Sequence, residues 1–291
     1  MSKIVKPVAA VLDAPAPHMV GDAFRVHNFF PNGYKLKMSP FFLLDYNAKI
    51  NFSARNQPRG VGVHPHRGFE TVTIVYHGAI AHEDSAGNSG VIYPGDVQWM
   101  TAASGILHKE YHEQAFSNTG GDFQIVQLWV NLPAQYKMTK PKYQALKHNE
   151  INKFIIPDDG GSVEVIAGAY QGIKGAASTF TPVEVYNIKL NAGAKIAFDL
   201  PASYNTGMLM VKGKVLTNDT DEANGDQFVQ FKNEGTAITI EALGNSTILM
   251  LSGEPIQEPI ASYGPFLMNK PEEIQQAIAD YNQGKFGYLE E

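Results

Sequence analysis

The sequence predicts an all-β protein built from two β-barrels or jelly rolls in tandem, with one α-helix near the C-terminus. Short apolar segments with strand-like alternation dominate residues 20–255, and turn residues separate them. Many short strands at such regular spacing are typical of a barrel or a jelly roll. A short pattern that occurs twice indicates two similar halves, and one strongly helical pattern follows them.

Composition excludes several classes of protein. Of the 291 residues, 44% are apolar and 18% are charged, which is typical of a folded chain long enough for one large domain or two ordinary ones. A net charge of −6 without a Lys/Arg cluster argues against direct nucleic-acid binding. No apolar run of about 18 residues could span a membrane, and the N-terminal segment is a poor signal peptide. We therefore expect a soluble, cytoplasmic protein.

The predicted strands are rich in Val, Ile and Tyr and are bounded by Gly, Asn, Asp or Pro. Examples are "TVTIVYHG", "DFQIVQLWVNL", "VEVIAGAY", "VEVYNIKL" and "AITIEAL". Strand alternation is lost over residues 132–150, which contain Pro133 and Pro141. We expect a short helical or irregular connection there, and it marks the best domain boundary.

A weak internal repeat supports two halves of similar fold. Residues 71–80 align with 206–215, because each segment has a threonine, a mostly apolar strand, a glycine seven positions later and an apolar residue two positions further on. We expect one barrel over residues 1–135 and a second over 136–291, with the terminal segments able to pack across onto the other barrel.

The predicted helix lies in "MNKPEEIQQAIADYNQGKFG". Asn269 can cap it with Glu272 three residues on, Pro271 fits its first turn, and Gly284 can end it. Four residues form an apolar face that must pack on another element: Ile274, Ala277, Ile278 and Tyr281.

Two histidines stand out in "GVGVHPHRGFET", residues 60–71. His64 and His66 are two residues apart on a predicted strand, so both point to one face, with Cα atoms about 6.6 Å apart. A metal site, a hydrogen-bonded pair in a core and chance placement on a solvent face all fit this spacing. The chain has no cysteine, so any metal site must use His, Asp, Glu or backbone oxygen.

A second pair with the same spacing, His108 and Glu110, lies in "SGILHKEYHE". A strand–turn–strand pattern of some forty residues separates the pairs and can return a strand beside the first. Three imidazoles and one carboxylate would then face into one barrel. Burial of these groups without a metal would cost several kcal/mol unless all were hydrogen-bonded. We therefore predict a mononuclear metal site with ligands His64, His66, His108 and Glu110.

The second half offers no equivalent of this site. In the alignment of the repeat, His64 and His66 fall opposite Asp199 and Pro201, and no histidine follows His148. We therefore expect a metal in the first barrel and none in the second.

These motifs resemble the metal-binding signature of the pirin family in the cupin superfamily. The resemblance rests on the segment from "GVGVHPHRGFET" to "SGILHKEYHE", and it extends to "SPFFLLDYN" and "GEPIQEPIASYGPFLMN", so it covers essentially the whole chain. It implies a bicupin, in which two jelly-roll barrels face each other and the metal lies in the N-terminal one. It also implies the ligand set given above.

Four further residues near the signature are candidates for the site. Glu70 stands where other cupins often have a carboxylate ligand, and we interpret it as a residue that supports the ligands without binding the metal. We interpret His112 as the strand end or the pocket rim, and His82 as a hydrogen-bonding structural residue. His77 has the opposite strand parity from His82 and a weaker claim to the site.

Three imidazoles and a carboxylate suit Fe(II), Mn, Ni, Co, Cu or Zn, and the resemblance implies Fe(II). The resemblance also implies quercetin 2,3-dioxygenase activity, in which a flavonol is deprotonated, reacts with O2 and opens with loss of carbon monoxide. Glu110 would then be catalytic as well as a ligand, because it can help remove the proton. Two alternatives stay open: an iron-dependent regulatory protein that binds a protein partner such as a transcription factor, and a cupin that converts sugars or small acids.

Overall fold

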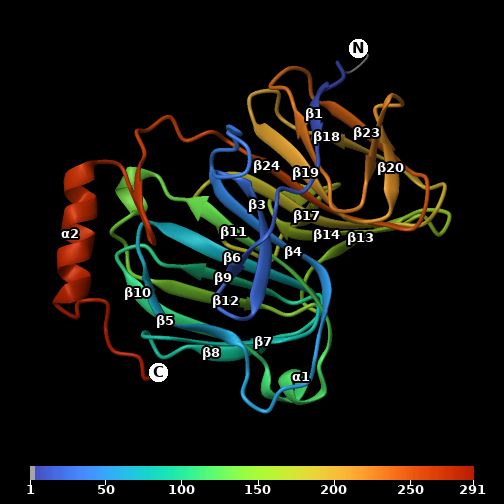
Figure 1. The fold of residues 1–291 in the computed structure, drawn as a ribbon. Coiled ribbons are helices and arrows are strands. Elements are labelled where there is room, and N and C mark those ends of the chain that lie inside the picture. The colour runs from blue at the N-terminus through green and yellow to red at the C-terminus, as the bar shows by residue number, and fades with distance from the viewer. Residues whose placement is uncertain (1–3) are drawn as a thin grey trace. The chain divides into compact units, whose positions relative to one another are not determined.

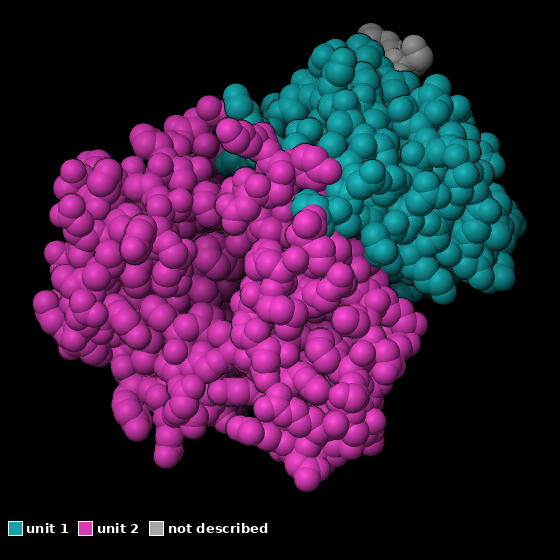
Figure 2. All heavy atoms as spheres, viewed as in Figure 1, with its two compact units in different colours: residues 1–15, 36–40, 149–255 teal, residues 16–35, 41–148, 256–291 magenta. Residues whose placement is uncertain are grey.

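Antiparallel sheets form both units of the chain in this computed structural model, which describes residues 4–291 (Figure 1). Unit 1 consists of the described part of residues 1–15 together with 36–40 and 149–255. Unit 2 consists of residues 16–35, 41–148 and 256–291. Figure 2 draws the two units in different colours. Each unit therefore combines segments that are far apart in the sequence.

Unit 2 contains a seven-stranded and a four-stranded sheet. The larger sheet has the strand order β12 (Lys142–Leu146), β9 (Val97–Thr101), β6 (Phe69–His77), β11 (Gly121–Asn131), β4 (Phe41–Phe52), β3 (Phe24–Phe30) and β2 (His18–Val20). The smaller sheet has the order β5 (Gly60–His66), β10 (Ile106–His112), β7 (Ile80–Asp84) and β8 (Ser89–Ile92). Side chains of both sheets line one cavity, so the sheets enclose it between them.

Shorter elements complete unit 2. They are the hairpin β25 (Ala261–Tyr263) and β26 (Phe266–Met268), the helices α1 (Gln114–Thr119) and α2 (Pro271–Asn282), and the 3-10 turn η1 (Ala134–Tyr136). The apolar face of α2 packs with β26 and the end of the chain in a small core. Its buried members are Leu107, Phe266, Met268, Ile274, Ala277 and Phe286.

Unit 1 repeats this plan. Its larger sheet has the order β1 (Val8–Leu12), β22 (Phe228–Phe231), β19 (Asn205–Lys212), β24 (Ser246–Gly253), β17 (Val183–Leu190), β14 (Gly161–Ala167) and β13 (Lys153–Ile156). Its smaller sheet has the order β18 (Lys195–Asp199), β23 (Ala237–Ala242), β20 (Lys214–Thr217) and β21 (Asp221–Asn224). β15 (Ala169–Tyr170) and β16 (Ile173–Lys174) pair in a separate two-stranded sheet.

The two strand orders correspond one to one, so the weak sequence repeat reflects a real structural repeat. The segments aligned from sequence lie in β6 and β19, which occupy the same place in the two larger sheets: β6 lies between β9 and β11, and β19 lies between β22 and β24. The prediction of an all-β chain with two similar halves and a helix near its C-terminus is confirmed.

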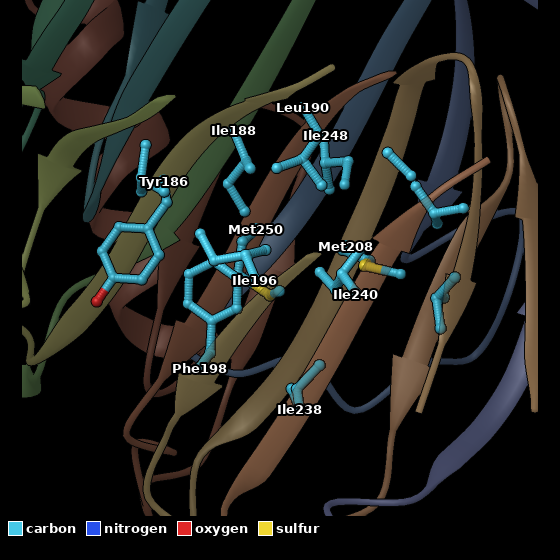
Figure 3. Packing of buried hydrophobic residues seen from close by; sticks show 14 of the residues in the cluster. Tyr186, Ile188, Leu190, Ile196, Phe198, Met208, Ile238, Ile240, Ile248 and Met250 are labelled. Atoms are coloured by element: carbon cyan, nitrogen blue, oxygen red, sulfur yellow. The ribbon is translucent and has the colours of Figure 1, made fainter. Parts of the chain in front are cut away.

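The core of unit 1 is filled with large apolar side chains. Figure 3 shows how Tyr186, Met208 and Met250 pack together with isoleucines and Phe198. All of these side chains are at most 8% exposed, and they come from both sheets of the unit. Such dense packing of apolar groups is the main source of stability for a sheet pair.

The compact units differ in extent from the expected barrels, residues 1–135 and 136–291. The N-terminal strand belongs to unit 1, because β1 pairs antiparallel with β22. Residues 256–291 belong to unit 2, because α2 packs against β25 and β26 of that unit. Residues 136–148 also belong to unit 2, since β12 pairs with β9.

Two local predictions are wrong. The connection over residues 132–150 contains the strand β12 as well as a 3-10 turn, so it is not wholly helical or irregular. Helix α2 has Lys270 as its N-cap instead of Asn269, and the carboxylate of Glu273 accepts the backbone N–H groups of both residues. Two adjacent glutamates made the capping pattern ambiguous by one residue. Within residues 4–291, no helix is long and apolar enough to cross a membrane.

Candidate metal centre

The candidate centre is built on the neighbouring strands β5 and β10 of unit 2. In their antiparallel register His108 lies directly opposite His64, and Leu107 lies opposite Pro65. His64 and His66 share one face of β5 because side chains alternate along a strand. Strand β5 is at the edge of its sheet, so the missing N–H of Pro65 costs the ladder little.

The three imidazoles form a compact triangle. Ring centroids lie 4.9 Å apart for His64 and His66, 4.2 Å for His64 and His108, and 4.7 Å for His66 and His108. One potential ligand atom from each residue lies within 4.8 Å of the other two. Nitrogens bound about 2.1 Å from one ion can be at most about 4.2 Å apart, so small side-chain movements close the triangle around a metal. Among residues 4–291, this is the one group of three such residues.

Hydrogen bonding around the rings fits a metal-binding role. The Nδ1 of His64 lies 2.8 Å from the carbonyl oxygen of Gly62. As a donor to that oxygen it leaves Nε2 as the free lone pair, which is how histidine ligands are usually oriented. The Nδ1 of His66 and both ring nitrogens of His108 are buried without a hydrogen-bond partner in the described chain. Such orphaned groups are rare in proteins, and a bound cation would satisfy one nitrogen on each ring.

Burial also sets the protonation of the site. It lowers the pKa of His66 and His108 well below the usual value, and the neighbouring His64 acts in the same direction. Both rings are therefore neutral at pH 7, as a metal ligand must be. Burial raises the pKa of Glu110, while His64 and a hydrogen bond from Gln127 act to lower it.

Glu110 lies near the triangle but outside it. It shares one face of β10 with His108, and it lines the same cavity as His64 and His66. Gln127 Nε2 donates to its two carboxylate oxygens over 3.0 and 3.3 Å. Its oxygens do not belong to the group of atoms within 4.8 Å of one another. The structure thus brings the three histidines together, and Glu110 as the fourth ligand stays a prediction.

A cavity of about 410 Å³ opens beside the imidazoles. This volume is in the range of small-molecule binding sites. Most of its wall is apolar, with a few polar groups between. It is lined by Val20, Phe24, Val26, Asp45, Val61, His64, His66, Glu110, Ile125, Gln127, Trp129 and Pro265.

Glu70 does not support the ligands, so that interpretation is wrong. The ring of Phe69 packs against His66, and the hydroxyl of Thr73 lies 3.5 Å from Glu110, so the odd-numbered residues of β6 face the site. Glu70 therefore faces the other side of the sheet, where it accepts a hydrogen bond of 2.7 Å from Thr101. Burial raises the pKa of Glu70 to about 7.

The other histidines near the signature lie outside the metal group. His82 is on β7 opposite Glu110, and its Nε2 lies 2.6 Å from the hydroxyl of Tyr143, which confirms its hydrogen-bonding role. His112 is the last residue of β10, as expected, but it is packed among phenylalanines and does not line the cavity. His77 is exposed at the end of β6.

Sequence reasoning missed the cavity residues Asp45, Gln127 and Trp129. One signal was available: Asp45 interrupts the apolar run in "FFLLDYN", and Gln127 interrupts "IVQLWV". A polar residue inside a buried strand usually has a specific partner or a ligand. The sequence does not show which strands lie beside the histidines, because strand order depends on pairing between segments that are far apart in the chain.

Fold and site together define a two-barrel β-protein, one barrel of which holds three histidines that can bind a metal ion. A family model described as "Pirin" matches residues 23–130, and one described as "Pirin C-terminal cupin domain" matches residues 185–287. The chain belongs to the pirin family.

Individual relatives agree with this assignment. A Pseudomonas aeruginosa protein named "Putative quercetin 2,3-dioxygenase PA2418" is 45% identical over 97% of this chain and 99% of its own length. A crystal structure of a quercetin 2,3-dioxygenase from Acinetobacter baumannii has a TM-score of 0.93 and 44% identity, covering 99% of this chain and 100% of the other. The Escherichia coli pirin YhhW in complex with nickel(II) has a TM-score of 0.67 and 21% identity, covering 85% and 99%. This last similarity shows the shared fold.

Proposed function

We propose that this protein is a mononuclear metal dioxygenase that opens flavonols such as quercetin. The observation that carries the proposal is the triangle of His64, His66 and His108 at the wall of a cavity large enough for a planar aromatic ligand. Relatives of at least 44% identity that are named for this activity support the choice of substrate. We assign Glu110 as the fourth ligand and Fe(II) as the metal.

The donor set fits such an ion. Three neutral imidazoles and one carboxylate suit several first-row metals. YhhW, which has the same fold, is in complex with nickel(II). When bound, the ion supplies Lewis acidity toward the ligand oxygens and a site for oxygen chemistry. His64, His66, His108 and Glu110 would hold the ion, which would bind the chelating oxygens of the substrate as its further ligands.

The residues of the chain perform the remaining tasks. A carboxylate oxygen of Glu110 accepts the proton of the 3-hydroxyl group, and Gln127 holds that carboxylate in place through two hydrogen bonds. The apolar side chains of Val26, Ile125 and Trp129 cover the ring system and exclude water. One flavonol and one O2 then give one ring-opened carboxylic acid ester and one CO.

The direct test is to supply the Fe(II)-loaded protein with quercetin and to measure O2 uptake and CO release together. We expect equal amounts of both from the wild type and from His77→Ala, whose histidine lies outside the metal group. His64→Ala should lose both signals. A metal-loaded wild type that binds quercetin but releases no CO would contradict the proposal and would favour a regulatory role.

A further inference from the structure

A row of four polar side chains crosses the larger sheet of unit 2. In the register of β6, β11, β4 and β3, Thr73 lies opposite Gln127, Gln127 opposite Asp45, and Asp45 opposite Asn28. Side chains of directly opposed residues point to the same face of a sheet. Gln127 and Asp45 line the cavity, so the row runs along its wall.

The first half of this row already has a function in the proposed centre. Gln127 donates to Glu110 over 3.0 Å, and Thr73 lies 3.5 Å from the same carboxylate. Neighbouring strands are about 4.8 Å apart, so Asp45 lies one strand spacing beyond Gln127 and further from Glu110. A planar ligand that reaches from the metal along this wall passes Asp45.

Asp45 is poorly satisfied by the protein alone. Asn28 Nδ2 donates to its Oδ1 over 2.6 Å, and this is the one hydrogen bond to its carboxylate that the described chain provides. A carboxylate accepts up to about four hydrogen bonds. Its neighbours in the cavity wall are largely apolar, and burial raises its pKa because the ionised form loses solvation. A donor group on a bound ligand would replace that lost solvation.

The corresponding row of unit 1 belongs to its buried core. In the structural repeat the positions of Thr73, Gln127, Asp45 and Asn28 correspond to Met208, Met250, Tyr186 and Val165, which lie opposite one another in the same way. All four belong to the buried core of unit 1, and Figure 3 shows Met208, Met250 and Tyr186 filling it. The polar row is therefore a feature of the unit that has the cavity, and the sheet itself does not require it.

We infer that Asp45 is a specificity-determining residue, which accepts a hydrogen bond from a hydroxyl group of the ligand other than the oxygens that chelate the metal. The ligand class is then a planar chelator with at least one further hydroxyl group. Ligands without that hydroxyl cover the carboxylate of Asp45 and leave Asn28 as its one hydrogen-bond donor in the described chain, and ligands with a negative charge there are repelled. This inference rests on the proposed function for the choice of flavonols as ligands.

The test compares two ligands with the same chelating oxygens: quercetin, which has further hydroxyl groups, and 3-hydroxyflavone, which has none. Dissociation constants are measured without oxygen on nickel-loaded protein, by quenching of the tryptophan fluorescence, to which Trp129 at the cavity wall contributes. A hydrogen bond to a charged group predicts that the wild type binds quercetin about 10- to 100-fold more tightly. Asp45→Asn, which keeps the shape and the acceptor for Asn28, should reduce this preference at least about threefold.

Ile125→Ala is the matched control, because Ile125 lines the cavity without a polar group. It should weaken both ligands by similar factors and leave their ratio unchanged. Equal affinities in the wild type, or a ratio that Asp45→Asn leaves intact, would overturn the inference. The wild-type ratio needs no variant, so poor folding of Asp45→Asn cannot hide the answer.

Failure of this inference differs from failure of the proposed function. Tight binding of quercetin with the expected ratio but without CO release contradicts the dioxygenase activity alone. CO release without any preference over 3-hydroxyflavone contradicts the role of Asp45 alone. If neither ligand binds, both are wrong.

Discussion

The hydrogen bonds of individual side chains distinguish residues that face the candidate metal site from residues that merely lie near it. His64 has one ring nitrogen fixed by the carbonyl of Gly62, whereas His108 has two buried nitrogens with no partner in the described chain. Glu110 and Glu70 are both buried carboxylates, yet Gln127 holds one at the cavity and Thr101 holds the other on the opposite face. Orientation, more than residue type, therefore decides which carboxylate can reach the ion.

This contrast predicts different effects for two matched substitutions. Glu110→Gln should lower the affinity for nickel(II) at least about 10-fold, because it removes a charged ligand while the three histidines remain. Glu70→Gln should leave it unchanged, since that side chain faces away from the site. Competition with a chelator measures both. Equal losses in the two variants would show that Glu110 is no closer to the metal than Glu70.

Helix α2 is tied to the strand that carries His64 and His66. Arg67 directly follows β5. Its Nη1 lies 2.9 Å from the carboxylate of Asp280 on the helix. Its Nε donates a hydrogen bond of 2.7 Å to the carbonyl oxygen of Ser104. Both charged side chains are at most 10% exposed. The guanidinium also lies over the ring of Phe286. Loss of the Asp280 carboxylate would leave the buried guanidinium of Arg67 without its ion-pair partner.

Asp280→Asn should therefore lower the free energy of unfolding at pH 7 by about 3 kcal/mol. Hydrogen bonds from Lys285, Arg67 and Gln276 hold the pKa of Asp280 below its usual range. A depressed carboxylate pKa stabilises the fold above the unfolded value of about 3.9 and loses this effect as the pH falls below it. The gap between wild type and variant should thus shrink from pH 5 towards the folded-state pKa.

Urea unfolding at several pH values measures this gap. Asp122→Asn is the control, because Asp122 forms an exposed pair with Lys49 and its loss should change stability little. A gap between wild type and Asp280→Asn that stays constant down to the lowest pH would show that the ion pair does not stabilise the helix contact.

The two units share one strand order but differ in what lies between their sheets. Both units have the same order of strands, yet unit 1 fills its interior and unit 2 keeps a cavity of about 410 Å³ beside three histidines. The difference comes from side chains at equivalent positions, such as Met208 in place of Thr73. The fold is therefore shared between the units, whereas the candidate function belongs to one of them.

Local rules of the sequence predicted much of this. Strand alternation places His64 with His66 and His108 with Glu110. The repeat aligns His64 and His66 with Asp199 and Pro201, so it predicts that the second half has no equivalent site. The cap of α2 was misplaced because Glu272 and Glu273 satisfy the same pattern. Asp45 and its neighbours in the polar row come from four strands, and only the order and register of those strands bring them together. These are long-range properties that single-sequence patterns do not encode.

The most direct test of the account counts metal ions per chain after chelator treatment and dialysis against nickel(II). We predict one ion per wild-type chain and essentially none in the double variant His64→Ala/His108→Ala, with the fold of both proteins checked by circular dichroism. Two ions in the wild type, or one ion retained by a folded double variant, would contradict a single metal centre made by the histidines of β5 and β10.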